Sequence, residues 1–210
     1  MYNRRLTDAA GGNISARVGD IICITPRYAG SKHLWQLQPE QVMVVDPTGK
    51  VLDGVGEISR ESQVHFRLLS EFPDAKAVVH GHAQNVMVFC AAGLPIVPVL
   101  EDTLKFEEIR VTAFAPAHSA SLAEHVMNAL RDQEEQIRKQ AAAVLVPSHG
   151  PFVVGKDLEA AFDALERIDL NAWCILQMTA LGFPANKEKV LQASRHAYIA
   201  LLEAISASPK

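Results

Sequence analysis

The 210-residue sequence predicts an α/β protein whose central sheet is mixed or antiparallel. Short apolar runs rich in β-branched residues alternate with segments of helical periodicity, which indicates both strands and helices. Two such runs, 42–45 and 50–52, flank a Pro-Thr-Gly turn and predict a hairpin, which argues against a doubly wound parallel sheet. Two helical segments near the C-terminus, 157–181 and 187–205, are expected to cover one face of this sheet.

The composition is ordinary for a soluble globular protein and excludes several functional classes. With 49% hydrophobic and 21% charged residues, the chain is long enough for one large domain with a real core. The net charge of −4 argues against a nucleic-acid binder, which would need a basic face. No apolar run approaches the ~20 residues of a membrane span, and no signal peptide is recognisable. Three widely separated cysteines are typical of reduced thiols, so we expect a cytoplasmic protein without nucleic-acid or membrane partners.

The first elements are a glycine-containing loop and a buried strand. Gly11, Gly12 and Asn13 lie in a loop at 8–15 and belong to residue types that tolerate positive φ. Such a loop either turns backbone N–H groups inward to bind an anion or forms an ordinary turn before a strand. The apolar, β-branched run at 20–25 predicts a buried strand that ends at a proline.

A helix is predicted from about residue 60 to 72, with Ser59 as its N-cap. Glu61 falls in the first turn, where a carboxylate ordinarily just complements the helix dipole. His65 lies one turn later among apolar neighbours, which is more typical of a packed histidine than of a metal ligand.

The second half continues the alternation of strands and helices. In chain order we predict a helix at 84–92 ended by Gly93, short strands at 96–100 and 111–113, a helix at 121–131, an exposed charged segment at 132–139, an apolar strand at 141–147 and a long helix at 157–181 whose apolar stripe is Leu158, Phe162, Leu165, Ala172 and Leu176.

Histidines occur at the ends of two predicted strands. The apolar run 76–79 leads into His80 and His82, whose side chains share one face of an extended strand and can converge on one ion. The third, His149, follows the strand at 141–147. Three neutral imidazoles leave an open position on a metal, which indicates a catalytic rather than a structural site. The alternative is a set of surface histidines at strand ends.

Five motifs occur in one order: Gly12-Asn13-Ile14-Ser15, Ile24-Thr25-Pro26, Ser59-x-Glu61 with His65, His80-Gly81-His82, and His149-Gly150 before a long helix. Together they resemble the class II aldolase/adducin family, whose best-known members cleave fuculose 1-phosphate. The resemblance spans roughly residues 6–181 and implies a three-layer α/β/α sandwich around a largely antiparallel sheet. We expect residues 1–210 to form one domain of this kind. The resemblance also implies a fourfold-symmetric homotetramer with active sites between subunits.

The implied activity is that of a metal-dependent aldolase, a lyase of carbohydrate metabolism. One divalent ion per chain, with zinc favoured and manganese, iron or cobalt as alternatives, would be held by His80, His82 and His149. A metal that binds a sugar carbonyl stabilises an enediolate, the electron sink that C–C cleavage needs. Glu61 is the candidate base that moves a proton to or from the carbon, and in family aldolases its counterpart also ligates the metal until substrate displaces it.

The expected substrate is a small phosphorylated or otherwise anionic sugar. The resemblance assigns anion binding to Gly12 and Asn13 of the loop, together with Thr25 and Ser59. Arg60 stands where family sugar-phosphate aldolases carry a second serine, and it either grips the anion bidentately or is a solvated helix residue.

The family aldolases place a proton-donating tyrosine near Val99, where this chain has none between 95 and 100. Glu101, Asp102, His118 and Tyr198 are alternative donors. Two other functions stay open: a dehydratase or decarboxylase with the same metal-enediolate chemistry, and a non-enzymatic adducin-like module. The epimerase branch carries Asp at the position of Glu61, which argues against a sugar 4-epimerase.

Overall fold

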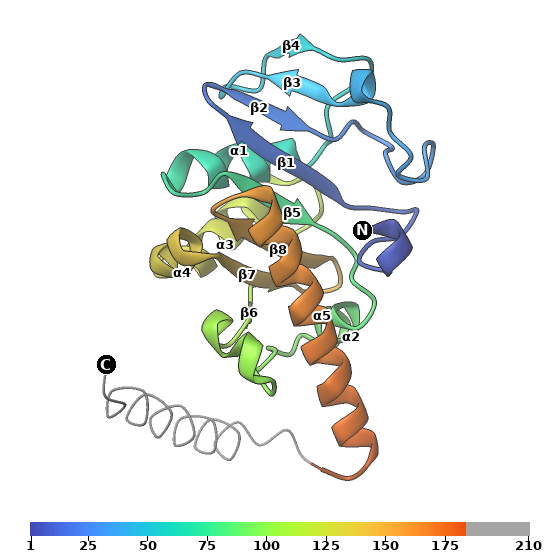
Figure 1. Cartoon of the computed structure of the whole chain (residues 1–210), viewed down its shortest axis with the longest axis vertical. Coiled ribbons are helices and arrows are strands. Elements are labelled where there is room, and N and C mark those ends of the chain that lie inside the picture. The colour runs from blue at the N-terminus through green and yellow to red at the C-terminus, as the bar shows by residue number, and fades with distance from the viewer. Residues whose placement is uncertain (184–210) are drawn as a thin grey trace, which may run out of the picture.

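The computed structural model describes residues 1–183, which form three layers with a mixed sheet in the middle (Figure 1). The strands, in chain order, are β1 (Asn13–Val18), β2 (Ile21–Ile24), β3 (Met43–Val45), β4 (Val51–Asp53), β5 (Ala77–His80), β6 (Arg110–Val111), β7 (Ala141–Val146) and β8 (Gly150–Gly155). They are ordered β4-β3-β2-β1-β5-β8-β7-β6. Every neighbouring pair is antiparallel except β6–β7. The predicted largely antiparallel α/β sandwich is therefore confirmed.

Helices cover both faces of the sheet. The α-helices are α1 (Ser62–Glu71), α2 (Val86–Ala92), α3 (Ala120–Leu130), α4 (Glu134–Lys139) and α5 (Leu158–Ala180), and the 3₁₀ turns are η1 (Tyr2–Arg4), η2 (Pro39–Gln41) and η3 (Glu101–Phe106). Figure 1 shows the long α5 crossing the sheet. Among residues 1–183, no helix has both the length and the apolar composition needed to cross a membrane.

Two hydrophobic cores result because successive side chains of a strand point to opposite faces. In β7, Val144 packs into the core with α1 and α3, whereas its neighbour Leu145 packs into the core with α2 and α5. All six residues of β7 and of β8 are buried, as expected for strands covered on both faces. The central strands are thus held rigidly, and their ends can hold side chains in fixed positions.

The structure corrects two strand predictions. Residues 97–100 form no strand, and Ile96 makes only an isolated bridge with Ile109. Asn171 explains this, because its side chain accepts hydrogen bonds from the N–H groups of Val99 and Leu100 that a neighbouring strand would otherwise take. The second error is that the sequence predicted no strand where the structure has β8. The apolar run there is short and lies between Pro151 and Gly155.

Three helix predictions also need correction. The helix at 60–72 begins at Ser62, with Glu61 as its N-cap residue. Ser59 instead begins the turn before it, because its carbonyl oxygen accepts the N–H of Ser62 at 3.1 Å and its hydroxyl accepts the N–H of Glu61 at 3.3 Å. The segment at 132–139 contains the short helix α4, whose Ile137 is buried. Leu158 of the expected stripe is exposed on α5.

The remaining predicted elements agree with the structure within a few residues. Gly93 ends α2 in the left-handed conformation with φ 64°, as a glycine C-cap requires. Asp157 caps α5 by accepting the N–H of Ala160. The predicted helix at 187–205 lies outside the described residues, as does Tyr198.

Candidate metal centre and its cavity

Three elements bring the chemically active side chains together. His80 is the last residue of β5, in the middle of the sheet, where it pairs with Asn13 of β1 on one side and Phe152 of β8 on the other. His149 lies in the turn between β7 and β8, and Glu61 is the N-cap of α1. One potential ligand atom from each of Glu61, His80 and His149 lies within 4.8 Å of the other two.

The Glu61 carboxylate lies between the two histidines. Its Oε1 is 2.8 Å from His149 Nε2, and its Oε2 is 3.4 Å from His80 Nε2. The Glu61 residue is only 6% exposed and His80 only 1%. Burying a carboxylate without partners would be costly, so its contacts with His149 and with the Asn13 amide are what make this position tolerable.

His80 is held as metal-binding histidines usually are. Its Nδ1 is 2.8 Å from the carbonyl oxygen of Pro151, which can only accept, so Nδ1 carries the proton. The other nitrogen, Nε2, therefore presents its lone pair toward Glu61 and His149. A hydrogen bond from Nδ1 to a carbonyl is the usual device that orients an imidazole for metal binding. The ring also stacks on Phe152 with 4.2 Å between the centroids.

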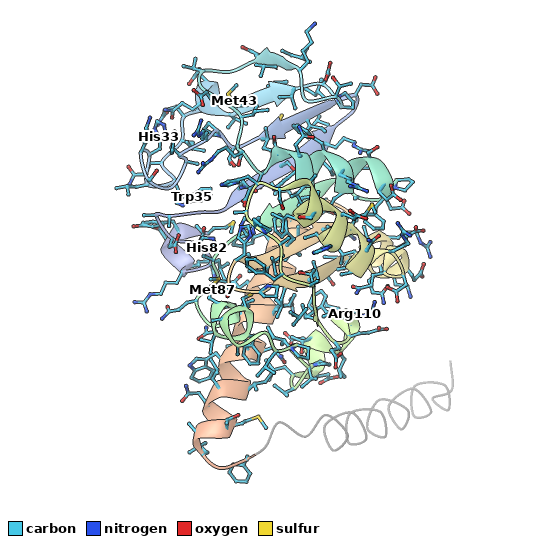
Figure 2. The ribbon with its side chains drawn as sticks, turned by 180° about the vertical axis from the view of Figure 1, so that it is seen from behind. His33, Trp35, Met43, His82, Met87 and Arg110 are labelled. Carbon is cyan, nitrogen blue, oxygen red and sulfur yellow. The ribbon has the colours of Figure 1, made fainter. Side chains whose placement is uncertain are left out.

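His82 lies beside this group but outside it among the described residues. Its ring centroid is 5.5 Å from that of His80, and its Nδ1 is 3.0 Å from Oδ1 of Asp8. The pairing with Asp8 leaves Nε2 of His82 available. A Cβ at Gly11 would lie 2.7 Å from that nitrogen, so only glycine leaves room for the ring. Figure 2 shows His82 on the same side of the molecule as Trp35 and Met87.

The protonation states suit a divalent ion. Burial chiefly lowers the pKa of His80 to about 4, despite the opposing charge of Glu61, so the imidazole is neutral at pH 7. Burial would raise the pKa of Glu61, but the hydrogen bonds from His149 and Asn13 stabilise the ionised carboxylate and hold the pKa well below its usual value. Two imidazoles and one carboxylate are a donor set that fits zinc and its neighbours in the first transition row.

A cavity of about 400 Å³ opens above these residues. Four of the five predicted substrate-binding residues line it: Gly12, Asn13, Ser59 and Arg60. Thr25 does not, because its hydroxyl is engaged with the N–H of Ile14 at 3.0 Å. The Ser59 hydroxyl also has partners, since it accepts from Asn13 Nδ2 at 3.1 Å and from the N–H of Glu61.

The cavity also contains side chains that motif spacing did not assign to it. Arg27 and Tyr28 come from the loop after β2, and Met87 comes from α2. His118 has a left-handed backbone with φ 65° and places Nδ1 3.7 Å from Oε1 of Glu61. The sequence indicates His118 only as one of several alternative proton donors, and this was the signal for its presence in the cavity. Nε of Arg27 is buried and has no hydrogen-bond partner among the described residues.

Comparison with known proteins extends the description. Residues 1–176 match the family model described as "Class II Aldolase and Adducin N-terminal domain". A 5-methylthioribulose-1-phosphate/5-deoxyribulose-1-phosphate aldolase of Rhodospirillum rubrum is 30% identical over 89% of this chain and 82% of its own length. A methylthioribulose-1-phosphate dehydratase of Methylococcus capsulatus is also 30% identical, over 77% of this chain and 80% of its own.

Among solved structures, an L-fuculose 1-phosphate aldolase superimposes with a TM-score of 0.76. The alignment covers 93% of this chain and 90% of the aldolase, at 22% sequence identity. At that identity the likeness concerns the fold, and it matches the three-layer arrangement described above.

Proposed function

The chain belongs to the class II aldolase and adducin N-terminal domain family, and from this premise we propose that it is a metal-dependent aldolase for a phosphorylated or otherwise anionic sugar. One observation carries the proposal: the buried Glu61 carboxylate contacts both His149 and His80 at the base of an open cavity. A buried cluster of this kind with only a structural role would have no need of an open cavity above it.

We propose that His80, His149 and His82 bind one divalent ion per chain, with Glu61 beside it. The donor set favours zinc, and manganese, iron and cobalt are the alternatives. When bound, such an ion supplies Lewis-acid chemistry, because it stabilises the negative charge that develops on a sugar carbonyl oxygen. The pairing of His82 with Asp8 supports its inclusion, since a carboxylate on Nδ1 orients Nε2 for binding.

Glu61 is the proton-transfer residue of the proposal. In the cleavage direction, the bond between the carbon next to the carbonyl and the hydroxyl-bearing carbon breaks. Glu61 takes the proton that the hydroxyl loses as the aldehyde forms, and it then delivers that proton to the carbon next to the carbonyl. We assign this step to Glu61 Oε1, which faces His149 and His118, whereas Oε2 accepts from Asn13 Nδ2 at 2.9 Å.

Cationic and polar groups of the cavity would hold the anionic end of the substrate. Arg60 and Arg27 line the cavity, and the buried Nε of Arg27 lacks an acceptor among residues 1–183. The guanidinium groups of Arg60 and Arg27 would bind a phosphate through charge-assisted hydrogen bonds. Backbone N–H groups at Gly12 and the Ser59 hydroxyl would complete the anion site. Asn13 would support it by donating to Ser59, and Thr25 by holding the loop from behind.

A dehydratase is the second candidate, supported by the 30% identity to a methylthioribulose-1-phosphate dehydratase. In that reaction Glu61 would remove a proton from the carbon next to the carbonyl, and the neighbouring hydroxyl would leave as water. The departing hydroxyl needs a proton donor, and His118 lines the same cavity.

We also propose that the whole chain is one domain and that it assembles as a homotetramer with sites between subunits. Light scattering should then give about 92 kDa, four times the 22.9 kDa of one chain. A monomer at micromolar concentration would contradict this assembly.

The activity test uses protein purified without chelator and analysed for bound metals. It should be incubated with 5-methylthioribulose 1-phosphate, 5-deoxyribulose 1-phosphate and fuculose 1-phosphate, each followed for aldehyde release and for loss of water. Aldehyde release that stops on chelation and returns with zinc would support the aldolase. Loss of water instead would establish the dehydratase. Protein that binds no divalent metal and converts no substrate would refute both and favour the non-enzymatic module.

A further inference from the structure

A chain of hydrogen bonds runs from the Glu61 carboxylate into the core. Glu61 Oε2 accepts from Nδ2 of Asn13 at 2.9 Å, Oδ1 of Asn13 contacts Nε2 of His65, and Nδ1 of His65 is 2.7 Å from the Ser15 hydroxyl. His65 is 0% exposed, Ser15 1% and Asn13 3%. These four residues, Glu61, Asn13, His65 and Ser15, are called the buried relay below.

The Glu61 carboxylate at one end of the buried relay decides which group donates and which accepts in each of its hydrogen bonds. A carboxylate only accepts, so Asn13 must present its NH₂ group to Glu61 and its oxygen to His65. That oxygen also only accepts, so His65 must carry its proton on Nε2. A neutral imidazole then has its lone pair on Nδ1, which accepts the hydroxyl proton of Ser15. Burial lowers the pKa of His65 to about 3, which keeps the imidazole neutral at pH 7.

Two sequence spacings place the relay residues opposite one another. Glu61 and His65 are four residues apart at the start of α1 and therefore share one helix face. Asn13 and Ser15 are two residues apart on β1 and share one strand face. One helix face and one strand face thus interlock through the buried relay.

Resting on the proposed function, we propose that His65 is a positioning residue that fixes the Glu61 carboxylate through Asn13. His65 sets the orientation of the Asn13 amide, and that amide binds Oε2 of Glu61. The other oxygen, Oε1, is then left facing His149 and His118, where proton transfer and metal binding occur. Without the donor at position 65, the Asn13 amide would keep only its contacts with Glu61 and Ser59, and the carboxylate's partner would be held less firmly.

A packing role alone does not explain this arrangement. A buried imidazole with two hydrogen-bonding nitrogens costs desolvation that leucine, of similar size, would avoid. Such polar networks specify one geometry when every member is satisfied, and every member of this one has a partner.

The test compares His65→Leu, which removes both nitrogens, with His65→Gln, whose amide can donate to Asn13 and accept from Ser15. Val64→Ala on the same helix controls for loss of stability, because Val64 is buried in the core and outside the relay. Zinc affinity is measured by chelator competition, and kcat and KM are measured per folded molecule. Long-range ¹H–¹⁵N NMR spectra of the wild type report the tautomer of His65.

We expect the Nε2–H tautomer in the wild type. His65→Leu should weaken zinc binding and lower kcat by roughly 10–100-fold each with KM nearly unchanged, as is usual for residues that orient ligands. His65→Gln should recover most of both losses, and Val64→Ala should lower stability without changing either quantity. If His65→Leu does not fold, Ser15→Ala replaces it and should give smaller losses in the same direction.

Several results would overturn the positioning role. These are an Nδ1–H tautomer, wild-type zinc affinity and kcat in folded His65→Leu, or losses that Val64→Ala reproduces. The tautomer is measured without metal or substrate, so it decides the relay even if the protein has no turnover. Conversely, an active wild type with an unaffected His65→Leu would reject the relay and leave the proposed function standing.

Discussion

Replacing Glu61 with glutamine is the most informative single change, because it keeps the side-chain shape and removes the charge. In the structure the carboxylate accepts from His149 Nε2 at 2.8 Å and from Asn13 Nδ2 at 2.9 Å. Glutamine has one acceptor, so with its oxygen toward Asn13 its NH₂ group faces His149, which must then accept. The variant can keep both contacts only if His149 changes its tautomer.

The expected loss of activity is large. A positioned general acid–base residue contributes about 10²–10⁴-fold, so Glu61→Gln should lower kcat by that factor. At about 1.36 kcal/mol per decade, this is about 2.7–5.4 kcal/mol of transition-state stabilisation. The free energy of unfolding should fall by no more than about 2 kcal/mol, the scale of one charge-assisted hydrogen bond.

The assay measures kcat, KM, bound zinc and the unfolding midpoint on the substrate that the panel identifies. Glu71→Gln is the matched control, since Glu71 is the exposed last residue of the same helix. It should change the free energy of unfolding by less than about 0.5 kcal/mol and leave kcat unaffected. Near-wild-type kcat in Glu61→Gln would refute proton transfer by Glu61, whatever its effect on zinc.

Three further changes test the rest of the site. His80→Ala and His149→Ala should each weaken zinc binding by at least about 100-fold in chelator competition. His82→Ala should do the same if His82 completes the ligand set. Full zinc content in all three variants would refute the metal centre. Arg60→Gln should raise KM about 10-fold or more with kcat retained, and an unchanged KM would remove Arg60 from the anion site. Folding lowers the pKa of His65 from 6.5 to about 3, so as the pH falls the unfolded chain takes up this proton before the folded protein does. The contribution of His65 to the free energy of unfolding is therefore complete above pH 6.5 and falls by about 2 kcal/mol by pH 5. Denaturation of His65→Gln in the presence of chelator should lack this loss.

Periodicity predicted the length of α5 and most of its apolar face, since Leu165 and Ala172 are buried and Phe162 and Leu176 pack against the same core, but it missed the polar part of that face. Apolar spacing pointed to Leu158, yet the buried face includes Asp169 and Asn171. Asp169 accepts the N–H groups of Asn85 and Val86 at the start of α2. A search for apolar residues cannot find such a face, because its polar members are buried in order to bind the backbone of distant segments.

The sequence by itself determined the types and the local spacing of the site residues. His80 ends strand β5, His82 follows two residues later, and His149 follows β7, as the apolar runs before them predicted. Alternation along a strand is a local property, so two positions of one strand can be assigned to the same face without knowing the fold. The order of the motifs along the chain then identified the family, which the match over residues 1–176 confirms.

Only the tertiary structure decided which of these side chains meet. Glu61 reaches His80 and His149 because α1 begins at Ser62, two residues later than a Ser59 cap would place it. His65 was expected to be a packed histidine, yet the pairing of α1 with β1 gives both of its nitrogens a partner. Helix starts and contacts between distant elements depend on long-range packing and hydrogen bonding, which no short window of sequence contains.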